Sequence, residues 1–133
     1  MTDGMAKKIT EKLDGYHILL AEDSPDQQRL FATLLQRAGA RVTLECNGES
    51  AVEQVMGGKE DFDAVVLDFM MPVMDGVEAT RQLRDNGFRK PIVAITAHGN
   101  QITEKEWLSA GADVFLLKPL GPTEFISAVQ SVF

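Results

Sequence analysis

The sequence lacks several features that would place it in a common class of protein. Its 133 residues include a single cysteine, Cys46, so no internal disulfide can form, which favours a reducing, cytoplasmic setting. We expect Cys46 to be a small, buried or half-buried apolar residue. No apolar run approaches the ~18 residues of a membrane-spanning helix, and the N-terminus has no apolar signal-peptide region, so we expect no membrane contact.

Positive charge is also scarce. Lysine and arginine number 13 against 20 acidic residues, which gives a formal net charge of −7. Nucleic-acid-binding domains normally carry a basic face, so we expect no nucleic-acid partner. The surplus of acid suits a divalent cation or a basic partner surface, although it often serves only solubility.

Five apolar runs alternate with five helical patterns, which predicts an α/β fold of the (βα)₅ type with a five-stranded parallel sheet and helices on both faces. The first, third, fourth and fifth runs are nearly continuous, as expected for parallel strands covered on both faces, whereas the second alternates and suits an edge strand. The predicted strands are 16–22, 40–46, 63–69, 91–97 and 113–119.

Capping residues and prolines indicate where the helices begin. The predicted starts are at Ser24-Pro25, at Asp75, at Thr103 with Glu106, and at Pro122. Leu30, Phe31 and Leu35 belong to the predicted buried stripe of the first helix. We expect one domain over residues 16–133, a linker or leader segment over residues 1–15, and no output domain after the last helix.

Polar residues interrupt the apolar runs at the same end of each strand. Glu22 and Asp23 follow "HILLA", Asp68 follows "AVVL", Thr96 follows "IVAI" and Lys118 follows "VFLL". Alone, each has a simple explanation as a loop acid, a turn cap, a strand residue or a surface lysine. Because the carboxyl ends of parallel strands share one edge, where ligands of open α/β sheets bind, their common position indicates a single site.

Three carboxylates at one edge repel one another, so the site requires a bound cation or the protonation of a carboxylate. Two carboxylates about 4 Å apart repel by roughly 4 kcal/mol at an effective dielectric near 20. Lys118 supplies one positive charge, and a hard divalent ion with oxygen ligands, Mg²⁺, would supply more. A carboxylate, Mg²⁺, an ammonium and a hydroxyl meet the needs of phosphoryl transfer, so we predict that Asp68 attacks phosphorus.

Four motifs give the chain its resemblance to response-regulator receiver domains of two-component phosphorelay signalling. "LLAEDS", "VVLDFMMPVMDG", "AITAHG" and "GADVFLLKP" match the family's acidic pair, phosphoacceptor turn, switch hydroxyl and lysine-proline motif. The resemblance covers residues 16–133 and implies a flavodoxin-like sheet with strand order 2-1-3-4-5. Residues 21–53 resemble receivers of hybrid sensor histidine kinases more than single-domain chemotaxis receivers.

The resemblance implies a role for each matching residue. Asp68 is the phosphoacceptor, and Mg²⁺, for which Mn²⁺ can substitute, is held by Asp68, by Asp23 directly, by Glu22 mainly through water and by the backbone carbonyl of Met70. Further residues contact or sense the phosphoryl group. They are Thr96 and Lys118 as its partners, Phe115 as the aromatic switch, Ala97 as a small residue that leaves access, and Pro119, whose cis peptide bond aims the lysine.

The implied reaction is transfer from a phosphohistidine of a sensor histidine kinase or histidine phosphotransfer protein to Asp68, followed by hydrolysis. The domain would thus catalyse its own phosphorylation and dephosphorylation and would not turn over a free substrate. Thr96 and Phe115 would alter the surface made by the fourth helix, fifth strand and fifth helix, with a phosphorylation-dependent homodimer as one compatible outcome. Met70 and His98 occupy positions that tune water access.

Two other classes of function occur on the same architecture, and the sequence argues against both. A flavodoxin needs a Ser/Thr/Gly-rich loop where "EDSPDQ" stands, and a haloacid-dehalogenase-type phosphatase needs a second Asp where Met70 stands. A receiver-like interaction module that is never phosphorylated usually lacks one or more of the five polar residues, all of which are present here.

Overall fold

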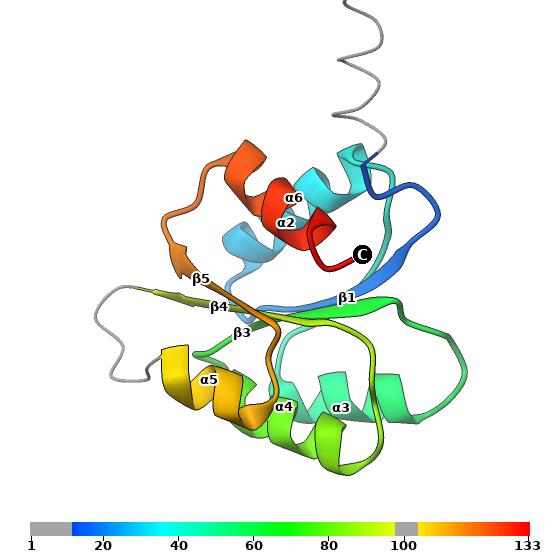
Figure 1. Ribbon diagram of the computed structural model, residues 1–133, viewed down its shortest axis with the longest axis vertical. Helices are drawn as coiled ribbons and strands as arrows, with labels where there is room; N and C mark the ends of the chain where they lie inside the picture. Colours follow the sequence, from blue (N-terminus) through cyan, green and yellow to red (C-terminus); the bar gives the residue numbers. More distant parts are fainter. Residues whose placement is uncertain (1–11, 98–103) are drawn as a thin grey trace, which may run out of the picture.

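The computed structural model describes residues 12–97 and 104–133, which form a five-stranded parallel sheet between two layers of helices (Figure 1). The strand order is β2-β1-β3-β4-β5, as predicted. The strands are β1 (His17–Ala21), β2 (Arg41–Glu45), β3 (Ala64–Asp68), β4 (Ile92–Ala97) and β5 (Val114–Lys118). The helices are α2 (Pro25–Arg37), α3 (Gly48–Met56), α4 (Gly76–Asp85), α5 (Glu104–Ala110) and α6 (Pro122–Gln130).

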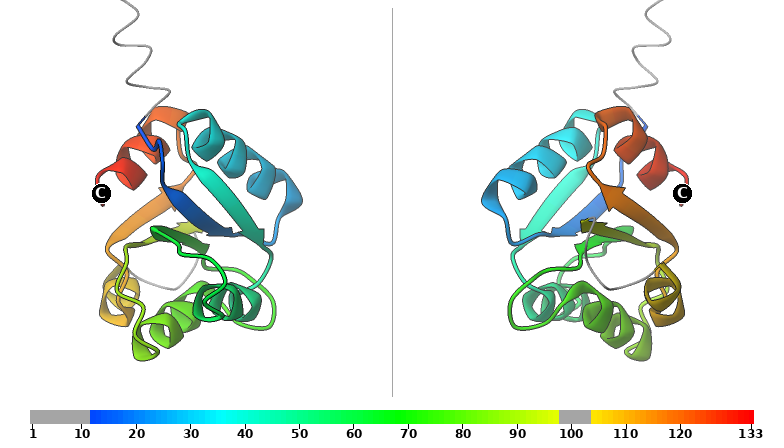
Figure 2. Two further views of the ribbon diagram at one scale, coloured as in Figure 1. Left: turned by 90° about the vertical axis from the view of Figure 1, so that its right-hand side faces the viewer. Right: turned by 90° about the vertical axis from the view of Figure 1, so that its left-hand side faces the viewer.

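Alternating side chains of the central strands build two separate apolar cores. Leu19 and Leu67 pack toward α3, α4 and α5, whereas Leu20 and Val66 pack toward α2 and α6. Figure 2 shows the two helical layers on opposite faces of the sheet. Every residue of β1 and β3 is buried, which explains why these strands read as continuous apolar runs instead of alternating ones.

The helix starts at Ser24, Asp75 and Pro122 are confirmed. The Ser24 side chain accepts a hydrogen bond from the backbone N–H of Gln27, and Asp75 accepts one from Glu78. Pro122 is the first residue of α6. The predicted capping box falls partly on Thr103, which lies outside the described residues.

Three predictions of burial were wrong. β5 is an edge strand whose residues are half-buried or exposed, because only β4 pairs with it, and Leu117 is 42% exposed. Cys46 is exposed because it follows the other edge strand, β2. Leu30 is 51% exposed and lies outside the core-facing stripe of α2 that contains Phe31 and Leu35.

The packed part of the chain includes residues that precede β1. Leu13 is fully buried against α2 and α6, and its backbone N–H donates to the carbonyl of Ala38. Lys12 donates to the hydroxyl of Ser127 in α6. Among the described residues, no helix is long and apolar enough to cross a bilayer.

Candidate phosphoacceptor site

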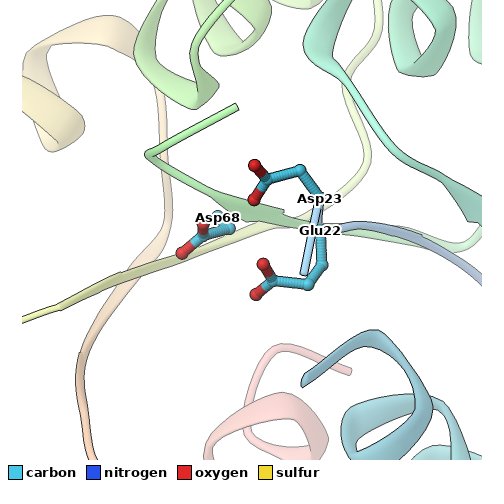
Figure 3. A group of neighbouring side chains, drawn as sticks. All are labelled: Glu22, Asp23 and Asp68. Atoms are coloured by element: carbon cyan, nitrogen blue, oxygen red, sulfur yellow. The ribbon is translucent and has the colours of Figure 1, made fainter. Parts of the chain in front are cut away.

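Three carboxylates meet at the carboxyl edge of the sheet. Asp68 ends β3, and Glu22 and Asp23 follow β1 directly. One carboxylate oxygen from each residue lies within 4.8 Å of the other two, and Figure 3 shows the three groups facing a shared space. Glu22 and Asp68 are buried, whereas Asp23 is exposed, so the cluster has one side open to solvent.

Lys118 joins this cluster from the end of β5. Its Nζ lies 2.9 Å from Oε1 of Glu22 and 3.0 Å from Oδ1 of Asp68, so one ammonium is shared between two buried acids. The same ammonium lies 5.8 Å from the centre of the Phe31 ring. The peptide bond between Lys118 and Pro119 is cis, as the resemblance implied.

Backbone contacts hold Glu22 in place. Its Oε2 accepts a hydrogen bond of 3.1 Å from the N–H of Ser24, and its own N–H donates to the carbonyl of Glu45 at the end of β2. The Gln28 side-chain amide donates to the carbonyls of both Glu22 and Glu45, at 3.1 and 3.2 Å. Gln28 was missed by the sequence analysis because it joins segments that become neighbours only in the fold.

The loop after Asp68 is closed by backbone hydrogen bonds. The N–H of Phe69 donates to Ile95 in β4, and the carbonyl of Phe69 accepts from the N–H of Gly76. Gly76 must lack a side chain because a Cβ there would collide with the carbonyl oxygen of Asp68. Met70 lies inside this closed loop, and its side chain is 59% exposed.

The remaining predicted residues lie on β4 and β5. Thr96 is buried near the end of β4, one residue beyond the register partner of Asp68, and Ala97 beside it is exposed. Phe115 is half-buried and packs against the core under α3, α4 and α5. His98 lies outside the described residues.

Burial and pairing shift the proton affinities of the three paired groups. Burial raises the pKa of Glu22 and of Asp68 above their ordinary values, and the hydrogen bonds from Lys118 oppose this only in part. For Lys118 burial acts to lower the pKa, but the hydrogen bonds to Glu22 and Asp68 and the charges of these two acids together outweigh it and raise the pKa. Three acids and one ammonium leave an excess of negative charge when all four are ionised.

We expect the metal-free protein to become more stable as the pH falls from 7 toward about 5. Because the folded-state pKa values of Glu22 and Asp68 are raised, the folded state binds protons more readily than the unfolded chain. Their stabilising contribution is complete below the ordinary values of 4.5 and 3.8 and is lost as the pH rises through the raised values. Urea midpoints in EDTA measure this trend, and Asp68→Asn should weaken it. A midpoint that is higher at pH 7 than at pH 5 would contradict the assignment.

The donor set at this edge fits a hard divalent cation. Carboxylate oxygens are the ligands that Mg²⁺ prefers, and an open side at Asp23 leaves room for the waters that this ion retains. An ion would also relieve the repulsion between three neighbouring carboxylates, which a single lysine offsets only in part. The residues present therefore suit Mg²⁺.

Comparison with known proteins identifies the family. The family model described as "Response regulator receiver domain" matches residues 18–130. The chain is 31% identical over 148 residues to probable histidine kinase 2 of Oryza sativa subsp. indica, covering 99% of this chain but 14% of that protein. It is 39% identical over 105 residues to a two-component response regulator of Oryza sativa subsp. japonica, covering 77% of this chain and 83% of the relative.

Solved structures agree with this assignment. The receiver domain of a sensor histidine kinase from Pseudomonas aeruginosa PAO1, described with a magnesium ion coordinated in its active site cleft, has a TM-score of 0.79 and 38% identity. The alignment covers 89% of this chain and 97% of that one. The family match, the strand order and the acidic edge point to one conclusion: this chain belongs to the response regulator receiver domain family and is a receiver domain of a two-component system.

Proposed function

We propose that Asp68 accepts a phosphoryl group from a phosphohistidine of a sensor histidine kinase or histidine phosphotransfer protein. The observation that carries this proposal is the position of Asp68, which ends a buried strand beside two further acids and 3.0 Å from the ammonium of Lys118. A carboxylate oxygen of Asp68 attacks phosphorus as the P–N bond breaks. The histidine nitrogen keeps the electron pair of that bond and takes up a proton.

Glu22, Asp23, Asp68 and the backbone carbonyl of Met70 would hold Mg²⁺, or Mn²⁺ in its place. The bound ion would supply positive charge that offsets the repulsion between the carboxylates and the incoming phosphoryl group. The convergence of the three carboxylates supports this ligand set, as does the magnesium ion named for the Pseudomonas receiver. Lys118 would form an ion pair with the phosphoryl oxygens.

The phosphoryl group would then change the output surface. Thr96, near the end of β4, would donate a hydrogen bond to a phosphoryl oxygen, and Phe115 would turn further into the core. The surface of α5, β5 and α6 would respond, with phosphorylation-dependent homodimerisation as one readout. Phosphorylation can change the free-energy difference between the two states by no more than the difference in the phosphoryl group's interaction free energy with each of them.

Hydrolysis would end the signal. Water attacks phosphorus, the bond between phosphorus and the Asp68 oxygen breaks, and the carboxylate is restored. The domain therefore acts on itself and is no enzyme for a free substrate. We place this exchange in the cytoplasm, with protein partners and without nucleic acid or membrane contact by this domain.

Intact mass spectrometry tests the proposal. We expect the protein to gain one phosphate mass on incubation with acetyl phosphate and Mg²⁺, and to gain none when EDTA replaces Mg²⁺. Borohydride reduces an aspartyl phosphate to homoserine, and the reduced residue should map to Asp68 within residues 65–76. A receiver-like module without phosphorylation chemistry would show no gain in either condition, and a gain that is insensitive to EDTA would refute the metal role.

A further inference from the structure

Trp107 is fully buried in α5, and its indole Nε1 has no hydrogen-bond partner in the described part of the chain. Burying an N–H donor without a partner costs stability, and tryptophan usually pairs this group. A phenylalanine would fill apolar space here without that cost. The contacts that the larger indole ring makes are therefore of interest.

The indole packs against the loop that follows the phosphoacceptor. A Cβ on Gly76 would collide with Cη2 of Trp107 as well as with the carbonyl oxygen of Asp68, so the indole edge and the Asp68 carbonyl flank the same backbone position. The Phe69 ring meets the indole edge-on, with ring centres 6.2 Å apart and an interplanar angle of 73°. α5 and α4 lie side by side under this edge of the sheet (Figures 1 and 2).

The indole therefore contacts Phe69 and Gly76, the two residues whose hydrogen bond closes the loop. The carbonyl of Phe69 accepts the N–H of Gly76 at 3.1 Å, and the N–H of Phe69 donates to Ile95 of β4 at 3.0 Å. Displacement of the indole would remove its packing contacts with Phe69 and Gly76, the two residues that form this hydrogen bond. The direction of the Asp68 carboxylate and the position of the Met70 carbonyl both depend on the loop, because Asp68 directly precedes it and Met70 lies within it.

We propose that Trp107 is a positioning residue for the phosphoacceptor loop, acting through Phe69 and Gly76 on Asp68. This inference rests on the proposed phosphorylation of Asp68 and adds a residue from a separate helix to the machinery. Phe115 packs against the same core cluster to which Trp107 belongs. We call the contacts of Trp107 with Phe69 and Gly76 the brace. Loss of the brace should weaken metal binding and slow phosphoryl transfer together.

The test compares Trp107→Phe and Trp107→Leu with Leu83→Val, a fully buried control in the same core at the other end of α4. We expect Mn²⁺ affinity, followed by electron paramagnetic resonance, to fall about threefold for the phenylalanine variant and about tenfold for the leucine variant. The rate constant for phosphorylation by acetyl phosphate should fall in the same order, since a small misplacement of reacting groups costs up to about 100-fold in rate. Leu83→Val should lose stability and keep both values.

The expected results differ between a Trp107 that positions the loop and a Trp107 that only fills the core. If Trp107→Phe binds Mn²⁺ and gains phosphate as the wild type does, the inference is wrong, whether or not the variant loses stability. Should Trp107→Leu not fold, the phenylalanine variant alone decides. In the wild type Trp107 is the one tryptophan, so its emission should also change on adding Mg²⁺ with beryllofluoride, and an unchanged emission counts against the brace. A wild type that gains no phosphate would refute the proposed function instead.

Discussion

Asp68→Asn is expected to abolish the phosphate gain while making the metal-free protein more stable at pH 7. The amide has no nucleophilic carboxylate oxygen, so no acyl phosphate can form. Burial raises the pKa of Asp68, which means that its ionised form destabilises the fold at neutral pH. We expect the free energy of unfolding at pH 7 to rise, because the neutral amide removes the cost of burying an ionised carboxylate.

Asp75→Asn is the matched control for this variant. Asp75 is an acid at the end of the same loop, but it accepts the N–H of Glu78 as the cap of α4, and asparagine caps as well as aspartate does. Intact mass and urea unfolding of both variants should show lost labelling and higher stability for Asp68→Asn alone. Labelling of Asp68→Asn at the wild-type level would overturn the site assignment.

Lys118→Met should have the largest effect on stability. Among the described residues, the Lys118 ammonium is the one cation that pairs with these two buried acids, so its removal leaves Glu22 and Asp68 facing each other without compensation. Removing one member of a buried charged pair typically costs about 3–5 kcal/mol. We expect a loss near the lower end of that range at pH 7 in EDTA, because protonation of one acid relieves part of it. Phosphate uptake should slow by about 100-fold, as for loss of one charge-stabilising donor.

Two further variants test the cause of that loss. Lys105→Met removes an exposed lysine of α5 and should leave both stability and labelling unchanged. The double variant Lys118→Met/Asp68→Asn should recover part of the lost stability, because one of the two unpaired acids is then neutral. If the double variant is less stable than Lys118→Met alone, repulsion between the acids is not the cause.

The sequence was sufficient to predict the sheet and the edge at which the site lies. Continuous apolar runs identify buried parallel strands, and a polar residue at the end of each run identifies a common edge, as found for Asp68 and Lys118. These features are local, since each depends on a residue's position within its own strand. Local chemistry also determined the helix caps at Ser24 and Asp75.

Other properties depended on contacts between distant segments. The exposure of Cys46 and Leu117 follows from their places at the two edges of the sheet. Gln28 links the ends of β1 and β2, and Trp107 lies 39 positions along the chain from Asp68 yet contacts the loop after it. The sequence by itself determined which polar residues stand at the carboxyl ends of the strands, because strand periodicity and residue type are encoded locally. Only the tertiary structure decided what pairs, braces and buries them, because those interactions exist only once the layers pack.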